Sequence, residues 1–234
     1  MTDDPRPPSE IRHRFEAELD AIKRGAVNLG SLVLENAGRL SEALLESQLD
    51  LAQRVIDADD VVDRAYIDLE RRIFKVIALQ QPVAGDLRFL ISIIRVGHEI
   101  ERSGDLVVNC AKGILRQQGF RLTGRLQGVL ARLCQAALDL FARGVDAVAS
   151  LDPEAGPRLD QEDDTVDSLV GEFYTLLASE AEGMHVDTAI ELSRVGRYME
   201  RIADHAVNIG EHIGFAVTGI FPRHGDIDEQ QGPV

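Results

Sequence analysis

The strongest constraint on the fold is a stretch of sequence that the chain contains twice. The first copy runs from Arg95 to Asn109, and the second runs from Arg194 to Asn208, 99 residues later. Eight positions carry the same residue in both copies, and three of them form the pattern Glu-x3-Asp-x3-Asn. A match of this quality at one constant offset is rare by chance. We therefore infer an internal duplication into two units of about a hundred residues each.

The spacing of apolar residues predicts helices and no sheet. Apolar side chains recur at steps of three and four residues, which is typical of amphipathic helices packed on one face. The expected helices cover approximately residues 9–51, 62–80, 83–116, 126–151, 159–181 and 186–217. The first is either one very long helix or two nearly collinear ones, with possible bends at Gly25, Gly30 and Gly38. Gly156-Pro157 is expected to lie in the break before the fifth helix.

These helices predict an all-α protein of two similar three-helix bundles packed side by side. We expect a disordered lead-in over residues 1–8 and a first three-helix repeat over 9–118. A second repeat is expected over 123–219, followed by a flexible tail over 220–234.

Composition excludes several classes of partner. The formal net charge of −15 opposes binding to nucleic acid or to an anionic membrane surface, since both favour basic proteins. The start of the chain has no apolar leader, and the most apolar run, 87–96, is interrupted by Arg88 and Arg95. Cys110 and Cys134 have no metal-type spacing and are too few for a disulfide framework. We expect a cytoplasmic protein.

The repeated acids are expected to lie on the apolar stripe of their helix. At 100° per residue, Glu101 falls about 20° from Leu90, between Val108 and Ile94 on the apolar face, and Asp105 follows one turn later. The same construction places Glu200 and Asp204 on the apolar face of the last helix.

A second set of acids faces the first in both repeats. The preceding helices carry Asp59-x3-Asp63 and Asp163-x3-Asp167. Asp63 and Glu101 each lie 19 residues from Pro82, and Asp59 and Asp105 each lie 23 residues from it. An antiparallel hairpin turning at Pro82 would therefore bring these acids to the same height. In the second repeat, the pairs Asp167 with Glu200 and Asp163 with Asp204 share a midpoint between Gly183 and Met184.

Four carboxylates at one level of a bundle need a compensating positive charge, because an uncompensated buried carboxylate costs several kcal/mol. A metal ion is the interpretation we favour, and oxygen ligands suit Mg²⁺, Mn²⁺ or iron. Asn109 and Asn208, one turn beyond each Asp, are second-rank candidate ligands. Two alternatives remain. Arginines, of which Arg102 and Arg201 match between the repeats, could neutralise the acids, or the acids could share protons at raised pKa values.

Other site types have less support. A ferritin-like di-iron site would need Glu-x-x-His, which neither Glu101 nor Glu200 begins. Four histidines show no metal-ligand spacing: His98, His185, His205 and His212. Gly97 and Gly196 are expected to let helices approach closely. No pattern of nucleophile and base is visible, so we expect a non-enzymatic protein with no catalytic residues.

The motifs together resemble one known family. The segment from Gln80 to Arg88, with its Gln-Gln-Pro turn, is followed by the two acidic copies, and the chain resembles the PhoU family of phosphate-signalling regulators over about residues 11–219. The second repeat departs from the pattern, because Glu182 to His185 stand in place of the Gln-Gln-Pro turn.

The resemblance implies two three-helix bundles with multinuclear metal clusters held by the paired acidic motifs. The matching positions are Asp59, Asp63, Glu101, Asp105, Asp163, Asp167, Glu200 and Asp204. It also implies a cytoplasmic adaptor that contacts the ATPase subunit of the phosphate ABC transporter and a sensor histidine kinase, and that represses the phosphate-starvation response. Such a protein would reach the membrane only through its partners, and a homodimer is possible. The competing functions are a metal-storage or redox protein and a purely structural helical interaction module.

Overall fold

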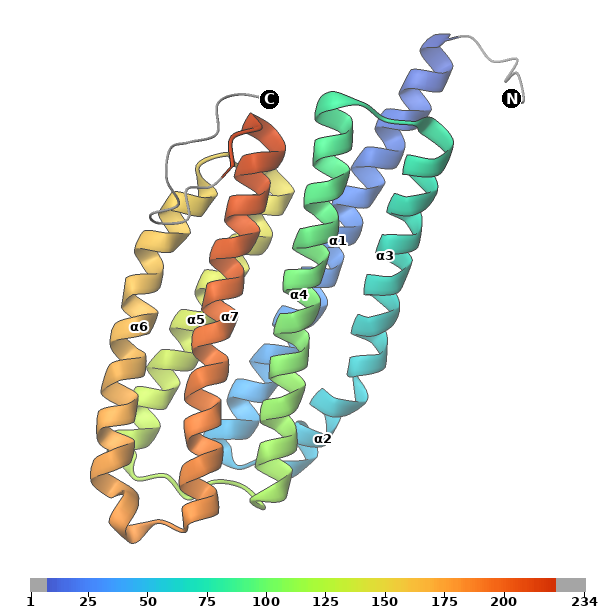
Figure 1. The fold of residues 1–234 in the computed structure, drawn as a ribbon. Helices are drawn as coiled ribbons and strands as arrows, with labels where there is room; N and C mark the ends of the chain where they lie inside the picture. Colours follow the sequence, from blue (N-terminus) through green and yellow to red (C-terminus); the bar gives the residue numbers. More distant parts are fainter. Residues whose placement is uncertain (1–7, 222–234) are drawn as a thin grey trace.

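The computed structural model describes residues 8–221 and forms an elongated all-helical molecule (Figure 1). Within these residues there is no β-strand, and no helix is both long and apolar enough to cross a membrane. The elements are α1 (Pro8–Glu46), α2 (Leu49–Asp57), α3 (Asp59–Gln80), α4 (Ala84–Arg116), α5 (Gly124–Ser150), α6 (Ala155–Glu180), the short 3₁₀ turn η1 (Ala181–Gly183) and α7 (Val186–Thr218). The expected lead-in, apart from Pro8, and the tail beyond Phe221 lie outside the described residues.

Four long helices form the centre of the molecule. Helix α1 packs against α4 and α5, and α7 packs against the same two helices, so that the two repeats share one core. Helix α3 covers α1 and α4 on one side, and α6 covers α5 and α7 on the other (Figure 1). The prediction of two three-helix bundles packed side by side is confirmed, with α2 as an additional short helix.

The first long helix breaks at a different place from the one that the glycines suggested. Helix α1 runs unbroken through Gly25, Gly30 and Gly38, and the chain turns at Ser47, whose φ is +54°. The Ser47 hydroxyl donates to the carbonyl of Phe120 at 2.7 Å and accepts from its amide at 3.1 Å. The helix is therefore not interrupted at the glycines, and a contact with the α4–α5 connection fixes the place where it breaks.

The expected turns lie close to their predicted positions. Gln81 adopts a left-handed conformation, with φ +47°, directly before Pro82, and α4 begins two residues after the proline. Helix α6 begins at Ala155, so Pro157 lies in its first turn and not in the break that precedes it. Proline is tolerated there because the amide that it lacks would have no partner within the helix.

Small residues allow the outer helices to approach the central ones. A Cβ on Gly97 would lie 3.5 Å from Leu69 and from Tyr66 of α3, and one on Gly196 would lie 3.0 Å from Phe173 of α6. The two glycines of the repeated stretch thus occupy equivalent contact positions. Their predicted role in close helix packing is confirmed.

The antiparallel helices α4 and α7 are joined at one end by Arg88. Its guanidinium, near the start of α4, donates to the carbonyls of Ala216 and Val217 in the last turn of α7, at 3.0 and 3.3 Å. A cation at a helix C-terminus satisfies carbonyls that lack a partner within the helix and interacts favourably with the helix dipole. The contact ties the first repeat to the end of the second.

Candidate metal centre

The acids of the first repeat lie near one another, as the sequence predicts. Asp59 and Asp63 occupy the first two turns of α3, and Glu101 and Asp105 face them from the middle of α4. Burial, then Asp63 and Asp105, raise the pKa of Asp59 above its ordinary value. Burial, then Asp105 and, more weakly, Asp63, raise the pKa of Glu101. The carboxylates of the two helices are therefore close enough to repel one another.

The acids of the second repeat face one another in the same way, and the pKa of one of them is raised further. Burial, followed by repulsion from Asp167 and Asp204, raises the pKa of Asp163 to about 7. Oδ1 of Asp163 is buried and accepts no hydrogen bond within the described residues. Burial and the neighbouring Glu200 likewise raise the pKa of Asp204. A carboxylate in this position is stabilised by a proton or by a bound cation.

The acids are less buried than the helical angles suggested. Asp63, Asp167 and Asp204 are exposed, and the other five are half-buried: Asp59, Glu101, Asp105, Asp163 and Glu200. The face is the expected one, because Gly97 and Gly104 on the same stripe of α4 contact α3. The acids nevertheless lie along the open edge between two helices, where carboxylates reach water. A position on the apolar stripe therefore does not bury these carboxylates fully.

Arginines neutralise part of this charge. Arg102 pairs with Asp105 at 3.3 Å, and Arg197 pairs with Glu200 at 2.6 Å. Arg71 pairs with Asp68, outside the motif, and Arg64 donates to the carbonyl of Asp60. These contacts give partial support to the arginine alternative. One acid in each repeat is paired, and the remaining acids keep an excess of negative charge.

The donor set suits a hard cation, but the side chains do not converge on one point. Among residues 8–221, no three His, Cys, Asp or Glu side chains are close enough to hold one ion. The case for a metal ion at these acids therefore rests on two features. The donors are all oxygen atoms arranged in facing pairs, and one oxygen of Asp163 has no hydrogen-bond partner within the described residues. Side-chain rotation would be needed to complete a coordination sphere.

The second-rank residues do not join the acids. Asn208 instead donates from Nδ2 to the carboxylate of Glu99 across the α4–α7 contact, at 3.3 Å, and Asn109 is exposed. His205, which is buried, lies 2.9 Å from the hydroxyl of Ser103, and burial lowers its pKa to about 4. This polar contact between the repeats was not predicted. The signal was present, because His205 and Ser103 stand where the other copy has Leu106 and Ile202.

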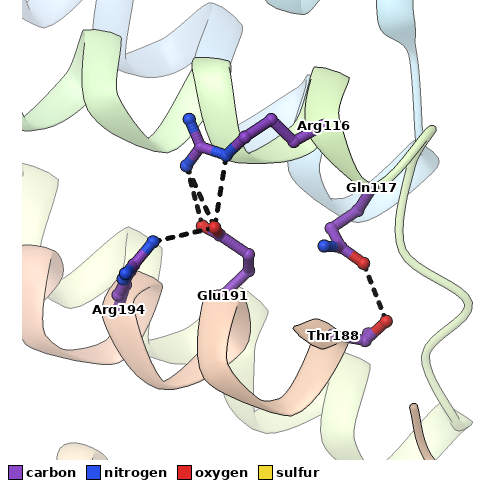
Figure 2. A network of polar contacts seen from close by, with 5 residues as sticks. All are labelled: Arg116, Gln117, Thr188, Glu191 and Arg194. Carbon is purple, nitrogen blue, oxygen red and sulfur yellow. Dashed lines mark hydrogen bonds and ion pairs between the residues drawn. The ribbon is translucent and has the colours of Figure 1, made fainter. Parts of the chain in front are cut away.

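An ion pair to a buried carboxylate at the other end of the α4–α7 contact was also missed (Figure 2). Glu191 of α7 is only 8% exposed and accepts from Nε and Nη2 of Arg116 on α4, at 3.0–3.2 Å. Arg194, one turn along α7, donates to the same carboxylate at 2.9 Å, and Thr188 donates to Gln117 beside it. The network joins the end of α4 to the start of α7.

Comparisons with known proteins identify the fold and the duplication. The PhoU domain model matches twice, over residues 27–114 and 130–213. The phosphate-specific transport system accessory protein PhoU homolog 2 of Mycobacterium tuberculosis is 34% identical over 211 residues, which cover 90% of this chain and 98% of the relative. The PhoU homolog of Rhizobium meliloti is 31% identical, with 92% of each chain covered.

Solved structures show the same architecture. The phosphate transport system regulatory protein PhoU from Streptococcus pneumoniae superposes with a TM-score of 0.81 at 24% identity, covering 90% of this chain and all of that one. At this identity the likeness establishes the fold. Two domain matches spanning most of the chain, together with relatives above 30% identity over nearly their whole length, show that the chain belongs to the PhoU family.

Proposed function

We propose that this chain is a non-enzymatic cytoplasmic adaptor that represses phosphate uptake and phosphate-starvation signalling when phosphate is plentiful. The observation that carries the proposal is the double PhoU domain match with relatives named as accessory proteins of the phosphate-specific transport system. The adaptor would contact the ATPase subunit of the phosphate ABC transporter and a sensor histidine kinase. Its long helical faces offer extended surfaces for such contacts.

Deletion of the gene should switch on phosphate-starvation promoters in phosphate-replete medium. A promoter reporter should rise to the level of phosphate-starved wild-type cells, and a plasmid copy of the gene should restore repression. One genome can encode two such proteins, as Mycobacterium tuberculosis does with homolog 1 and homolog 2. Where the host carries a second PhoU gene, that gene is therefore deleted as well. A reporter that stays repressed in the double deletion would contradict the adaptor function and favour a metal-storage or purely structural protein.

We further propose that the paired acids bind a divalent or trivalent metal ion, with Mg²⁺, Mn²⁺ or iron as candidates. The residues that would hold it are Asp59, Asp63, Glu101 and Asp105 in one repeat, and Asp163, Asp167, Glu200 and Asp204 in the other. When bound, the ion would neutralise the excess negative charge and so brace α3 against α4 and α6 against α7. The raised pKa values and the partnerless oxygen of Asp163 support this proposal.

Asp163→Asn should stabilise the chelator-treated protein at pH 8. The folded-state pKa of Asp163, about 7, lies above its ordinary value of 3.8, so the folded state binds the extra proton between about pH 4 and 7. Stability from this proton is lost as pH rises through 7. At pH 8 the Asp163→Asn variant should therefore have a free energy of unfolding about 1 to 2 kcal/mol higher than the wild type, after allowance for solvent screening. Its Tm should be higher by about 3 to 6 °C.

The metal proposal is tested in the same thermal unfolding experiment. The gain from Asp163→Asn should vanish at pH 4, where the wild-type carboxyl is protonated too. Mn²⁺ added at pH 8 should raise the Tm of the wild-type protein by more than that of the variant. Equal Mn²⁺ increments in the two proteins would contradict a metal role for Asp163, and elemental analysis of natively purified protein identifies the ion.

A further inference from the structure

A basic groove lies on the surface of the first repeat. It lies between the N-terminal part of α1 and the C-terminal half of α3, near the turn into α4 (Figure 1), and has a volume of about 410 Å³. We define the basic groove by its four cationic side chains, Arg14, Arg71, Arg72 and Lys75. Glu18 is the single acid among its lining residues.

Most of this positive charge is available to a partner. Arg72 is held by Glu18 at 3.0 Å, whereas Arg71 makes only a 3.7 Å contact with Asp68, in which both side chains are 76% exposed. Exposed pairs of this kind contribute little. Neither Arg14 nor Lys75 pairs with a carboxylate in the part of the chain that the structure describes. The chain as a whole has a net charge of −15, so the local positive field of the basic groove is opposite in sign to the net charge.

The basic groove is apolar as well as basic. Val76 is buried at its floor, and Leu79 lies in its lining with 67% of its surface exposed. The aliphatic stems of the arginines and the lysine add further apolar surface beneath their charged ends. An occupant that carried only charge would leave this surface in contact with water.

The duplicated fold does not require these cations. At an offset of 104 residues, which aligns the acids of α3 with those of α6, three residues of the second repeat replace the cations of α3: Thr175, Leu176 and Ser179. Gly183 takes the place of Leu79. The second repeat folds in the same way without cations at these positions of α6 and without the exposed leucine, and the cations of its equivalent groove, Arg125 and Arg132, come from α5. These side chains are therefore specific to the surface of the first repeat.

We propose that the basic groove docks an acidic amphipathic segment of a partner protein, with carboxylates that meet the free cations and an apolar side chain that covers Leu79. The inference deepens the proposed adaptor function by giving the chemistry of one docking face, and it rests on that function for its biological role. A helix is of suitable width for a space between two helices, and it presents acids and apolar residues on one face at steps of three and four.

Two other anionic ligands fit less well. An extended anionic membrane would contact more of the chain than the basic groove, and the net charge of −15 opposes that approach. Free phosphate would use the charge but leave Leu79 uncovered. A second copy of this chain would bring another −15 charges to the contact. A narrow acidic segment meets the cations, covers Leu79 and contacts little of the remaining surface of the chain.

The test is a selection from a displayed library of random peptides, each about 15 residues long, which allows about four helical turns. The bait is the full-length protein, with counter-selection against the double variant Arg71→Glu and Lys75→Glu. Enriched peptides should carry Asp or Glu at steps of three or four around Leu, Ile or Phe. One such peptide, labelled with a fluorophore, should bind the double variant at least about tenfold more weakly than wild type.

The matched control reverses the same number of charges elsewhere. Arg54→Glu with Arg121→Glu changes two exposed arginines, on α2 and on the α4–α5 connection, at the opposite end of the molecule (Figure 1), and should weaken the peptide less than about twofold. Circular dichroism confirms that both double variants keep their helices. Enriched peptides without acidic residues, or equal weakening by both variants, would overturn the proposal.

Three further measurements exclude other occupants. Phosphatidylglycerol vesicles or inorganic phosphate that bound wild type but not the groove variant would overturn the proposal in favour of a membrane or phosphate site. A dimer seen by light scattering and lost in the groove variant would overturn it in favour of self-association. If the protein represses the reporter but selects no acidic peptides, the docking inference is wrong and the adaptor function stands. If it binds acidic peptides but does not repress the reporter, the adaptor function is wrong.

Discussion

Replacing Arg116 by alanine should lower the free energy of unfolding by about 2 to 3 kcal/mol, because it removes the hydrogen bonds that Glu191 accepts from α4 in the network of Figure 2. Glu191 is 8% exposed and would keep only Arg194 as a partner. Removing one member of a buried ion pair typically costs 3 to 5 kcal/mol, and the half-exposed position of Arg116 reduces this figure. Urea unfolding followed by circular dichroism measures the loss.

The control for this prediction is a comparison of the stability losses caused by different substitutions in the same network. Glu191→Gln should cost less than Arg116→Ala, because Arg116 and Arg194 are both 52% exposed and can be hydrated when the carboxylate is removed. Arg121→Ala, at an exposed position near the same end of α4, should change stability by less than about 0.5 kcal/mol. If Glu191→Gln proved the more damaging change, the buried carboxylate would not be the group that needs compensation.

Replacing Gly210 by valine should cost about 3 kcal/mol, because there is no room for a side chain where α7 crosses the start of α6. A Cβ at Gly210 would lie 2.9 Å from the backbone nitrogen of Gly156 and 2.9 Å from Cδ1 of Leu159. Helix backbones cannot give way as a flexible side chain can, so the two helices would have to separate. Thermal and urea unfolding of the purified variant measure the loss.

A second glycine separates this steric effect from the intrinsic cost of glycine in a helix. A Cβ on Gly171, in the middle of α6, would have no neighbour within 4 Å. Gly171→Ala should therefore raise the free energy of unfolding by about 0.5 to 1 kcal/mol, since alanine favours the helix. Wild-type stability in Gly210→Val would show that α6 and α7 are further apart than described.

The helices and their pairing could be predicted from local patterns. Periodic apolar residues locate the long helices, and Pro82 locates the turn that brings Asp63 level with Glu101. The break at Ser47 could not be predicted, because it depends on hydrogen bonds to Phe120, 73 residues away in the sequence. The start of α6 was misplaced because a proline is compatible both with a break and with a first helical turn.

The candidate site was predicted in its composition but not in its burial. Helical angles give the direction in which Glu101 leaves α4, and that direction was correct. They do not give how far α3 covers the carboxylate, which depends on the packing of three helices. The polar contacts between the repeats do not follow the duplication. At the offset of 99 residues, Glu191, Ser103 and His205 correspond to Ser92, Ile202 and Leu106, which are residues of a different kind. Comparing the two copies for differences would have found them.

The contact between Arg88 and the last turn of α7 bears on how the chain is synthesised. Arg88 and Ala216 lie 128 residues apart in the sequence, and at usual rates of translation roughly ten seconds separate their appearance at the ribosome. The first repeat therefore emerges with the face that α7 will cover still open to water. Until the last helix arrives, that face is a site at which the nascent chain is vulnerable to aggregation and available to chaperones.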